Sequence, residues 1–514
     1  MSDVAKVLIY GEWRDADAGE TFAATNPATG RALPGKFPVS RWSDLDAALS
    51  AADEAFVELQ SVDVETIASF LDKYADKIDA AGEQLAAMAE QETALPAATR
   101  LGKVEIPRTS NQLRLCAKAA RSGEWSLPTI DTAANIRSRH EAIGPVVVFG
   151  PNNFPFAFNG ISGGDFAAAI AAGNPVVAKA HPLHPATSRR LAELAKEAVD
   201  EAGLPAATVQ MLYHFGNDDG TKLVSDKRVG AVAFTGSRRA GLALKQSADA
   251  AGTPIYLELG SVNPVVLLPD ALAGRGDNIA GEYATSCTMG VGQFCTNPGL
   301  VFAVAGEATE AFVATVKEAF ESAEPGTLFS QGGRDGLADA IKTLISAGAS
   351  VVTGGEIAGD SKFKNTLLRV DGGVFLTKAE TLQTEAFGNA GLVVVCDDLD
   401  QLTELLHHVE GNLTGCIYGD EGYDKIEPIL KRRVGRLLNN KMPTGVAVSP
   451  AMVHGGPYPS ASPSNFTAVG PPASLRRFSV LRCYDNVAEA RLPSLLRDTH
   501  GGRGFRLVDG QWQR

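Results

Sequence analysis

The chain has 514 residues, of which 45% are hydrophobic and 21% charged, and its formal net charge at pH 7 is −13. This length exceeds what one compact core uses, so we expect two or three domains of an ordinary soluble globular protein. The net negative charge argues against nucleic acids and anionic membranes as partners, because both require basic surfaces.

Six cysteines are spread through the chain without a C-x-x-C pair, and no histidine cluster has metal-ligand spacing. The sequence therefore predicts no metal site, and it favours a reducing compartment. The N-terminus has no apolar signal segment, and no apolar run is long enough to cross a bilayer. We expect a cytoplasmic protein without a membrane partner.

The first 142 residues predict helices between extended segments. Residues 43–91 are rich in Ala, Asp, Glu and Leu at helical spacing, which fits two or three helices. Residues 105–120 predict another helix, in whose first turn Pro107 is tolerated. The extended segments are short strands and turns within residues 6–33 and a linking segment in residues 124–142.

From residue 144 onward, apolar strands alternate with helices through short connections. The expected strands of the first such region are residues 145–149, 175–179, 209–213, 231–235 and 255–259. A second alternating region follows, from about residue 260 to residue 449. This alternation implies an α/β fold with doubly wound parallel sheets, which bind ligands at the carboxyl ends of their strands.

The most regular helical pattern lies between residues 187 and 203. Its apolar residues form one continuous face: Leu191, Leu194, Ala195, Ala198, Val199 and Ala202. Thr187 or Ser188 is expected to cap the start of this helix, and Gly203 its end.

Residues 290–299, Gly-Val-Gly-Gln-Phe-Cys-Thr-Asn-Pro-Gly, place one thiol among small, turn-forming residues. A cysteine is most often a small buried hydrophobe, so Cys295 can be a core thiol. A glycine-rich backbone can also point N–H groups at a reacting atom, as a nucleophilic thiol requires. This stretch alone leaves both interpretations open.

Several expected strands end in polar residues where a ligand would bind. Glu258 ends an apolar strand, where desolvation makes a carboxylate a stronger base, although a structural salt bridge explains it equally well. Lys179 ends another strand and can hold a ribose hydroxyl or extend to solvent. Gly236 and Ser237 open a helix whose free N–H groups favour a diphosphate, or they cap that helix.

Six motifs in register resemble the NAD(P)-dependent aldehyde dehydrogenase superfamily over almost the whole chain. The motifs are Asn153-Phe154-Pro155, Lys179, Phe234-Thr235-Gly236-Ser237, Leu257-Glu258-Leu259-Gly260, Gly292-Gln293-Phe294-Cys295-Thr296 and Glu385-Ala386-Phe387-Gly388. Each motif is weak alone, but their order and approximate spacing agree with that family.

The resemblance implies a role for each matched residue. Cys295 would attack an aldehyde as a thiolate, Asn153 and the Cys295 backbone N–H would hold the oxyanion, and Glu258 would activate the water that hydrolyses the thioester. The resemblance also implies contacts to NAD or NADP from Pro151, Lys179, Gly236, Ser237, Glu385 and Phe387.

The same resemblance implies two doubly wound domains and a small β element. Residues 1–123 and 143–258 would form the dinucleotide-binding domain, and residues 259–460 the catalytic domain. Residues 124–142 and 476–514 would form a bridging element that pairs subunits into a homodimer or homotetramer.

Residues 179–185 and 454–459 resemble one branch of this superfamily, which contains 2,5-dioxovalerate (α-ketoglutaric semialdehyde) dehydrogenases and NADP-using bacterial fatty aldehyde dehydrogenases. The branch implies a short semialdehyde acid as substrate, or alternatively a medium- or long-chain aldehyde. An acidic substrate needs a cation, and Arg108, Arg114 and Phe154 are the expected substrate residues. Six positions on a helix turn the two arginines about 120° apart, so we expect one of them to face the pocket.

The sequence does not decide between NAD and NADP as the cofactor. Pro182 replaces an acidic residue that NAD-preferring relatives carry, which leaves room for a 2′-phosphate. Asn217, however, stands where NADP-using relatives of the branch often carry an arginine.

Three other functions are alternatives to aldehyde oxidation. CoA-acylating relatives typically lack the glutamate found here at Glu258. A silent binding protein on the same fold is disfavoured because Cys295, Asn153 and Glu258 occur together, although a fold alone does not prove activity. A cysteine hydrolase needs a partner base, and the sequence places no histidine in that role.

Overall fold

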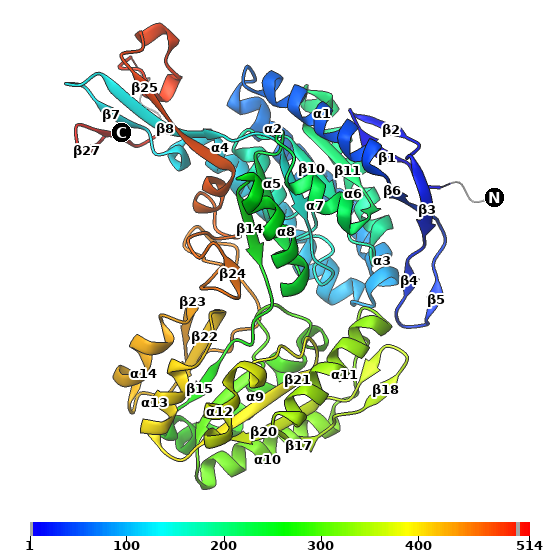
Figure 1. Cartoon of the computed structure of the whole chain (residues 1–514), viewed down its shortest axis with the longest axis vertical. Helices are drawn as coiled ribbons and strands as arrows, with labels where there is room; N and C mark the ends of the chain where they lie inside the picture. Colours follow the sequence, from blue (N-terminus) through cyan, green and yellow to red (C-terminus); the bar gives the residue numbers. More distant parts are fainter. Residues whose placement is uncertain (1–3, 500–503, 514) are drawn as a thin grey trace.

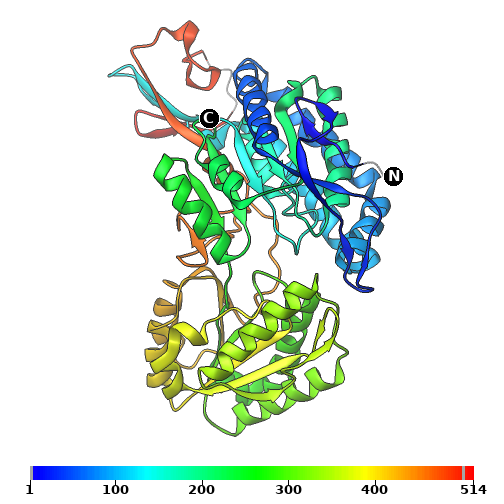
Figure 2. The same ribbon diagram turned by 45° about the vertical axis from the view of Figure 1, so that its right-hand side comes forward.

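Two open α/β sheets and a smaller β-sheet organise the described chain, residues 4–499 and 504–513, in this computed structural model (Figure 1). Figures 1 and 2 show the two larger sheets as separate lobes, with the smaller sheet projecting from the lobe that holds the N-terminus. Within the described residues, no helix is long and apolar enough to cross a membrane. The predicted α/β class with parallel sheets is confirmed.

The first sheet has eight strands in the order β2-β1-β11-β10-β9-β13-β14-β24. Their bounds are β1 Val7–Ile9, β2 Glu12–Arg14, β9 Val146–Phe149, β10 Val176–Lys179, β11 Val209–Leu212, β13 Ala231–Thr235, β14 Ile255–Glu258 and β24 Ala461–Ser462. The five central strands run parallel, and they are the five strands predicted from the sequence. Buried Val and Ala side chains fill both faces of these strands, as expected for a parallel sheet covered by helices.

Helices cover this sheet and extend the lobe. They are α1 Trp42–Leu59, α2 Val64–Ala80, α3 Gly82–Thr93, α4 Ile106–Ser122, α5 Gly164–Ala171, α6 Pro185–Ala202, α7 Asn217–Val224 and α8 Arg238–Ala251. A short three-stranded sheet lies beside them, in the order β12-β6-β3, with β3 Ala18–Phe22, β6 Phe37–Ser40 and β12 His214–Phe215.

The second sheet has seven strands in the order β17-β20-β21-β16-β15-β22-β23. Their bounds are β15 Val265–Leu267, β16 Leu300–Val304, β17 Ser350–Thr353, β20 Thr366–Asp371, β21 Ala390–Cys396, β22 Asn412–Tyr418 and β23 Val434–Asn439. All neighbours are parallel except the edge strand β17, which is antiparallel. The helices of this lobe are α9 Pro269–Thr288, α10 Glu307–Ser322, α11 Gln331–Ser346, α12 Gly372–Leu382, α13 Leu399–His407 and α14 Tyr423–Leu430.

The projecting β arm joins two distant segments of the chain. Its strand order is β25-β8-β7-β26-β27, with β7 Thr129–Asp131, β8 Ile136–Ala142, β25 Ser479–Asp485, β26 Arg506–Val508 and β27 Gln511–Gln513. β25 pairs antiparallel with β8 along its whole length. The predicted linking segment 124–142 therefore contributes β7 and β8 to this sheet, while residues 500–503 and 514 of the expected bridging element lie outside the described chain.

The predicted N-cap of α6 was wrong, although Gly203 ends the helix in a left-handed conformation as expected. The helix begins earlier, at Pro185, so Thr187 and Ser188 lie inside it and are buried. The buried carboxylate of Glu92 accepts hydrogen bonds from the Ala186 and Thr187 N–H groups, both at 2.9 Å. It thereby provides acceptors for N–H groups of the first turn that have no partner within the helix. A residue 94 positions away thus replaces the local cap.

We predict that Glu92→Ala destabilises the protein by about 2–4 kcal/mol, because it leaves buried N–H donors of α6 without an acceptor. Chemical denaturation followed by circular dichroism measures this change. Gln84→Ala, at an exposed site on the same helix α3, is the matched control and should change stability by less than about 0.5 kcal/mol. Equal effects of the two substitutions would contradict the capping role.

Candidate active site

A tight turn after α9 presents the thiol of Cys295. Gly290, Val291 and Gly292 have φ values of 56°, 59° and 67°, three successive left-handed conformations. A Cβ at Gly292 would lie 2.0 Å from the Gly388 carbonyl oxygen, so only glycine fits there. The predicted glycine-rich loop is therefore a turn held against the chain that leads into β21.

Two asparagine side chains fix this loop. Asn263 donates through Nδ2 to the carbonyl oxygens of Cys295 and Asn297, both at 2.9 Å. Asn153 donates through Nδ2 to the Gln293 carbonyl oxygen at 3.0 Å. Asn153 comes from the first lobe and the thiol loop from the second, so this last bond joins the two lobes at the thiol.

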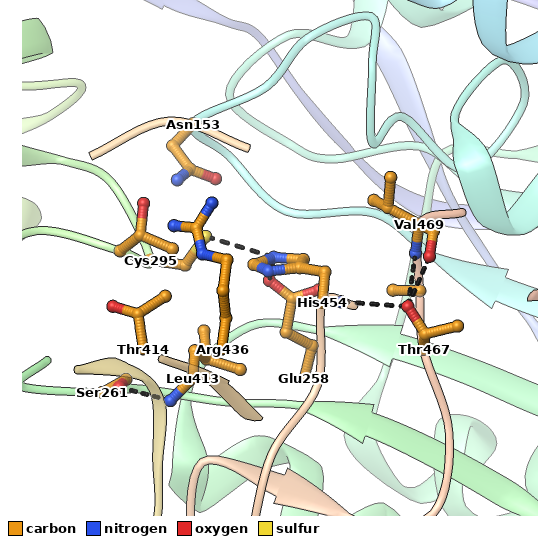
Figure 3. A network of polar contacts seen from close by, with 12 residues as sticks. Asn153, Glu258, Ser261, Cys295, Leu413, Thr414, Arg436, His454, Thr467 and Val469 are labelled. Carbon is orange, nitrogen blue, oxygen red and sulfur yellow. Dashed lines mark hydrogen bonds and ion pairs between the residues drawn. The ribbon is translucent and has the colours of Figure 1, made fainter. Parts of the chain in front are cut away.

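His454 stands between the thiol and the glutamate (Figure 3). Its Nε2 lies 3.5 Å from Cys295 Sγ and 2.7 Å from Glu258 Oε1. The three atoms lie within 4.8 Å of one another, a spacing that also suits a metal ion, which the sequence did not indicate. In serine and cysteine hydrolase triads, the nucleophile and the carboxylate bond to different ring nitrogens of the histidine. Here Cys295 and Glu258 both lie next to Nε2 of His454, which is a different arrangement.

Sequence reasoning missed this histidine. It lies 159 residues beyond Cys295, in irregular chain between β23 and β24. Antiparallel pairing of β24 with β14 brings that chain back to Glu258. The His454 backbone N–H then donates to Thr467 Oγ1 at 2.9 Å. The only signal in the sequence was its place in the branch motif of residues 454–459.

The electrostatics of the group favour a protonated thiol. Burial raises the pKa of Cys295 well above its usual value, and the nearby Glu258 carboxylate raises it further, while the charge of Arg108 lowers it. Both His454 and Glu258 are buried, and Glu258 Oε2 has no hydrogen-bond partner within the described chain. A thiol in this state needs a proton acceptor before it can attack.

A pocket of about 220 Å³ opens beside the thiol at the carboxyl edge of the first sheet. Its walls are Pro151, Asn152, Asn153, Thr235, Gly236, Ser237, Glu258, Leu259, Gly260, Cys295, Glu385 and Phe387. The structure thus brings together eight of the predicted catalytic and cofactor residues, all except Lys179. Lys179 ends β10, two strands away from β13 in the sheet.

The pocket residues fit a dinucleotide. Ser237 caps α8, whose N-terminal N–H groups face this edge of the sheet, as a diphosphate requires. Glu385 accepts a hydrogen bond from the Ser261 N–H at 3.0 Å, and burial raises the pKa of its carboxyl to about 7. A Cβ at Gly260 would lie 2.1 Å from Glu385 Oε2, so a larger residue there would displace that carboxylate from the pocket wall.

The two arginines predicted as substrate anchors lie in different environments. Arg114 is 41% exposed and pairs with Asp76 at 2.6 Å and Asp79 at 2.8 Å, so the structure does not bring it to the site. Arg108 packs over the rings of Phe154 and Phe158, and its Nη2 is buried with no partner among the described residues. Its charge acts on Cys295.

Two more guanidinium groups approach the same region, and neither was predicted. Arg100 packs over Phe154 and pairs with the buried Glu105 at 2.8 Å. Arg436 extends toward the thiol (Figure 3) and donates to the carbonyl oxygens of Pro443 and Gly445, with no ion pair among the described residues. No spacing in the sequence connects a residue of β23 with this pocket.

The fold and the pocket place the protein among the α/β enzymes that combine a dinucleotide cofactor with a reactive thiol. The model of the aldehyde dehydrogenase family matches residues 13–462. The α-ketoglutaric semialdehyde dehydrogenase 2 of Azospirillum brasilense is 39% identical over 99% of this chain and 100% of its own. The α-ketoglutaric semialdehyde dehydrogenase of Acinetobacter baylyi is 37% identical over 92% of each chain.

Solved structures agree with these matches. The NAD⁺ complex of an aldehyde dehydrogenase from Bacillus cereus has a TM-score of 0.82 at 24% identity, over 94% of this chain and 96% of its own. The chain therefore belongs to the aldehyde dehydrogenase family. The protein is an NAD(P)-dependent aldehyde dehydrogenase, as the motifs of the sequence predicted.

We predict that Glu258→Gln shifts the reactivity of Cys295 to lower pH, because it removes a negative charge that raises the pKa of this thiol. The measurement is the pH dependence of alkylation by iodoacetamide, in a Cys483→Ser background that lacks the exposed cysteine. An unchanged profile, or a shift to higher pH, would show that the carboxylate does not control this thiol.

Proposed function

We propose that this enzyme oxidises a short aldehyde with a distal carboxylate to the corresponding diacid, with α-ketoglutaric semialdehyde as the leading candidate. The observation that carries the proposal is Arg108, whose buried Nη2 has no partner among the described residues and whose charge acts on the thiol. A guanidinium binds a carboxylate through two parallel hydrogen bonds. The names of the two relatives with 39% and 37% identity support the same substrate.

The surroundings of Arg108 support an acidic substrate over a long neutral one. Of the carboxylates near it, Glu105 is already bonded by Arg100 and by the N–H groups of Phe156 and Ala157. Arg436 adds a second positive charge that has no acidic partner among the described residues. A medium- or long-chain fatty aldehyde would leave both charges desolvated and unpaired, so this alternative is not favoured.

The first step is attack by Cys295. Because Nε2 of His454 lies 2.7 Å from the Glu258 carboxylate, we assign its proton to that nitrogen. As Sγ bonds to the aldehyde carbon, the thiol proton passes to the Glu258 carboxylate, which lies within 4.8 Å of Sγ, while the Nε2–H of His454 donates to Oε1 and holds the carboxylate there. The new oxyanion accepts hydrogen bonds from the Cys295 backbone N–H and from Asn153, which must leave its bond to Gln293.

The second step releases the acid. NAD(P)⁺ would accept the hydride whose loss converts the thiohemiacetal into a thioester, and it would be held by Gly236, Ser237, Glu385, Phe387, Pro151 and Lys179. Glu258 then returns its proton to solvent through the pocket and activates a water molecule, which attacks the thioester on Cys295. The unpartnered Oε2 of Glu258 is the atom available for that water.

We also propose a cytoplasmic homodimer or homotetramer that pairs through the β arm. The outer edge of β25 has no strand beside it in the described chain, and Leu481 on this strand is 62% exposed. Such an edge presents unpaired backbone groups that a second subunit can satisfy. All six cysteines are free, which supports a reducing compartment.

We predict that Arg108→Met lowers kcat/KM for α-ketoglutaric semialdehyde by about tenfold to a hundredfold, the loss of one desolvated charge-assisted contact. Activity on a neutral aldehyde of similar length should change little. Arg114→Met is the matched control, because this arginine lies on the same helix but pairs at the surface, and it should behave like wild type. Equal losses on acidic and neutral aldehydes would remove Arg108 from this role.

We predict that Glu258→Gln gives a pre-steady-state burst of NAD(P)H followed by slow turnover. In this variant the thiol proton leaves to solvent through the pocket, so attack and hydride transfer occur once, but no carboxylate remains to activate the water. Stopped-flow absorbance measures the burst, and Cys295→Ala, which should give none, is the control. An unchanged kcat of Glu258→Gln would count against its role as the base.

A further inference from the structure

We propose that Cys295, Glu258 and His454 bind a zinc ion, which reversibly inhibits the enzyme. Their ligand atoms Sγ, Oε1 and Nε2 lie within 4.8 Å of one another, and the three side chains converge in Figure 3. This is the one group of three such side chains that the described chain offers to a metal ion. The binding rests on this geometry, whereas the inhibition rests on the catalytic roles proposed for Cys295 and Glu258.

The three atoms are the donor types that zinc prefers. Zinc is bound in proteins by cysteine sulfur, histidine nitrogen and carboxylate oxygen, usually in a tetrahedron. Magnesium and calcium take oxygen ligands and would leave the sulfur and the nitrogen unused. One sulfur, one nitrogen and one oxygen therefore select zinc over the hard cations. Three protein ligands leave the fourth tetrahedral position to a water molecule.

The distances between the ligand atoms fit a tetrahedral zinc ion. Bonds of about 2.3 Å to sulfur and about 2.0 Å to nitrogen, at a tetrahedral angle, place these two atoms about 3.5 Å apart. Sγ of Cys295 and Nε2 of His454 are 3.5 Å apart. Nε2 and Oε1 of Glu258, at 2.7 Å, must separate by about 0.6 Å to reach the corresponding nitrogen-to-oxygen distance. A small side-chain movement thus completes the site.

The charges of the ligands also favour a divalent cation. A thiolate on Cys295 and the carboxylate of Glu258 carry two negative charges, which one Zn²⁺ neutralises. Oε2 of Glu258 is buried without a partner in the described chain and can join Oε1 as a ligand. The charge of Arg108 acts on the thiol and opposes the cation, but its hydrogen bond goes to Gln112 and not to either ligand. Direct bonds to two negative atoms outweigh a more distant positive charge.

The backbone around each ligand is fixed by hydrogen bonds that a metal ion would not disturb. The Cys295 carbonyl oxygen accepts from Asn263 Nδ2 at 2.9 Å, and the His454 N–H donates to Thr467 Oγ1 at 2.9 Å. Glu258 ends β14, which pairs with β13 and β24. Cys295 and Glu258 also line the pocket of about 220 Å³, through which a hydrated cation can enter. The site is therefore both held in place and accessible.

Binding would exchange a proton for the metal ion. The cation replaces the thiol proton of Cys295, which leaves to solvent. It also takes the lone pair of Nε2, so the ring proton of His454 moves to Nδ1, the other position that a neutral imidazole allows. The bound sulfur cannot attack an aldehyde, and the bound carboxylate cannot activate water. Zinc is thus an inhibitor of this enzyme and not its cofactor.

The test titrates Zn²⁺ into the full-length enzyme by isothermal titration calorimetry, after a chelator has removed metals, in the Cys483→Ser background that lacks the exposed cysteine. This parent enzyme should bind one Zn²⁺ per chain, and occupancy should abolish turnover and protect Cys295 from iodoacetamide. EDTA should reverse both effects. Cys295→Ala and His454→Asn should each weaken binding about tenfold or more, at least as much as the loss of an outer-shell partner. His407→Asn, at an exposed site on α13 of the other lobe, is the matched control and should bind like the parent.

Cobalt(II) provides a second readout, because a thiolate ligand gives a charge-transfer band in the near ultraviolet, which Cys295→Ser should remove. No zinc binding by the parent enzyme would overturn the inference. Binding that both ligand variants keep would also overturn it, because the metal ion then lies elsewhere. Zinc that protects Cys295 without lowering turnover would contradict the inhibition and the proposed role of Cys295. A metal-free enzyme that oxidises no aldehyde contradicts the proposed function alone, since zinc binding and protection still test the site.

Discussion

The arrangement of the active site depends on one nitrogen atom, Nε2 of His454, which lies close to both the thiol of Cys295 and the carboxylate of Glu258. The three residues come from separate parts of the fold: the end of β14, the turn after α9 and the chain before β24. The pairing of β24 with β14 is what returns the histidine to the glutamate. Both lobes must therefore be in place before the thiol has a proton acceptor.

Burial has the largest effect on the protonation of the thiol in this arrangement. Desolvation raises the pKa of Cys295 and favours the protonated thiol, and the charge of Arg108 partly offsets this effect. Arg108 and Arg436 also place positive charge near the thiol, and neither forms an ion pair within residues 4–499 and 504–513. In a protein of net charge −13, this local positive charge is the basis of our proposal that the substrate is an acidic aldehyde.

Patterns with a short period were predictable from the sequence, and contacts set by tertiary packing were not. The apolar strands that end at Lys179 and Glu258 follow from composition, and so does the parallel fold. The helical phase correctly indicated that Arg108 and Arg114 point to different sides, but not which side faces the pocket. The predicted cap of α6 by Thr187 or Ser188 was wrong, because the carboxylate of the distant Glu92 accepts the hydrogen bonds of the first turn. His454 and Arg436 lie in segments without any periodic pattern, and only the folded chain brings them to the thiol.

The most direct test of the account is to trap the covalent intermediate that it places on Cys295. Glu258→Gln enzyme is mixed with α-ketoglutaric semialdehyde and NAD⁺ or NADP⁺, quenched in acid after one turnover, and examined by intact-protein and peptide mass spectrometry. The account predicts one acyl group per chain, on the peptide that contains Cys295, and none without the cofactor. An absence of this adduct while NADH or NADPH is formed, or an acyl group on another cysteine, would contradict it.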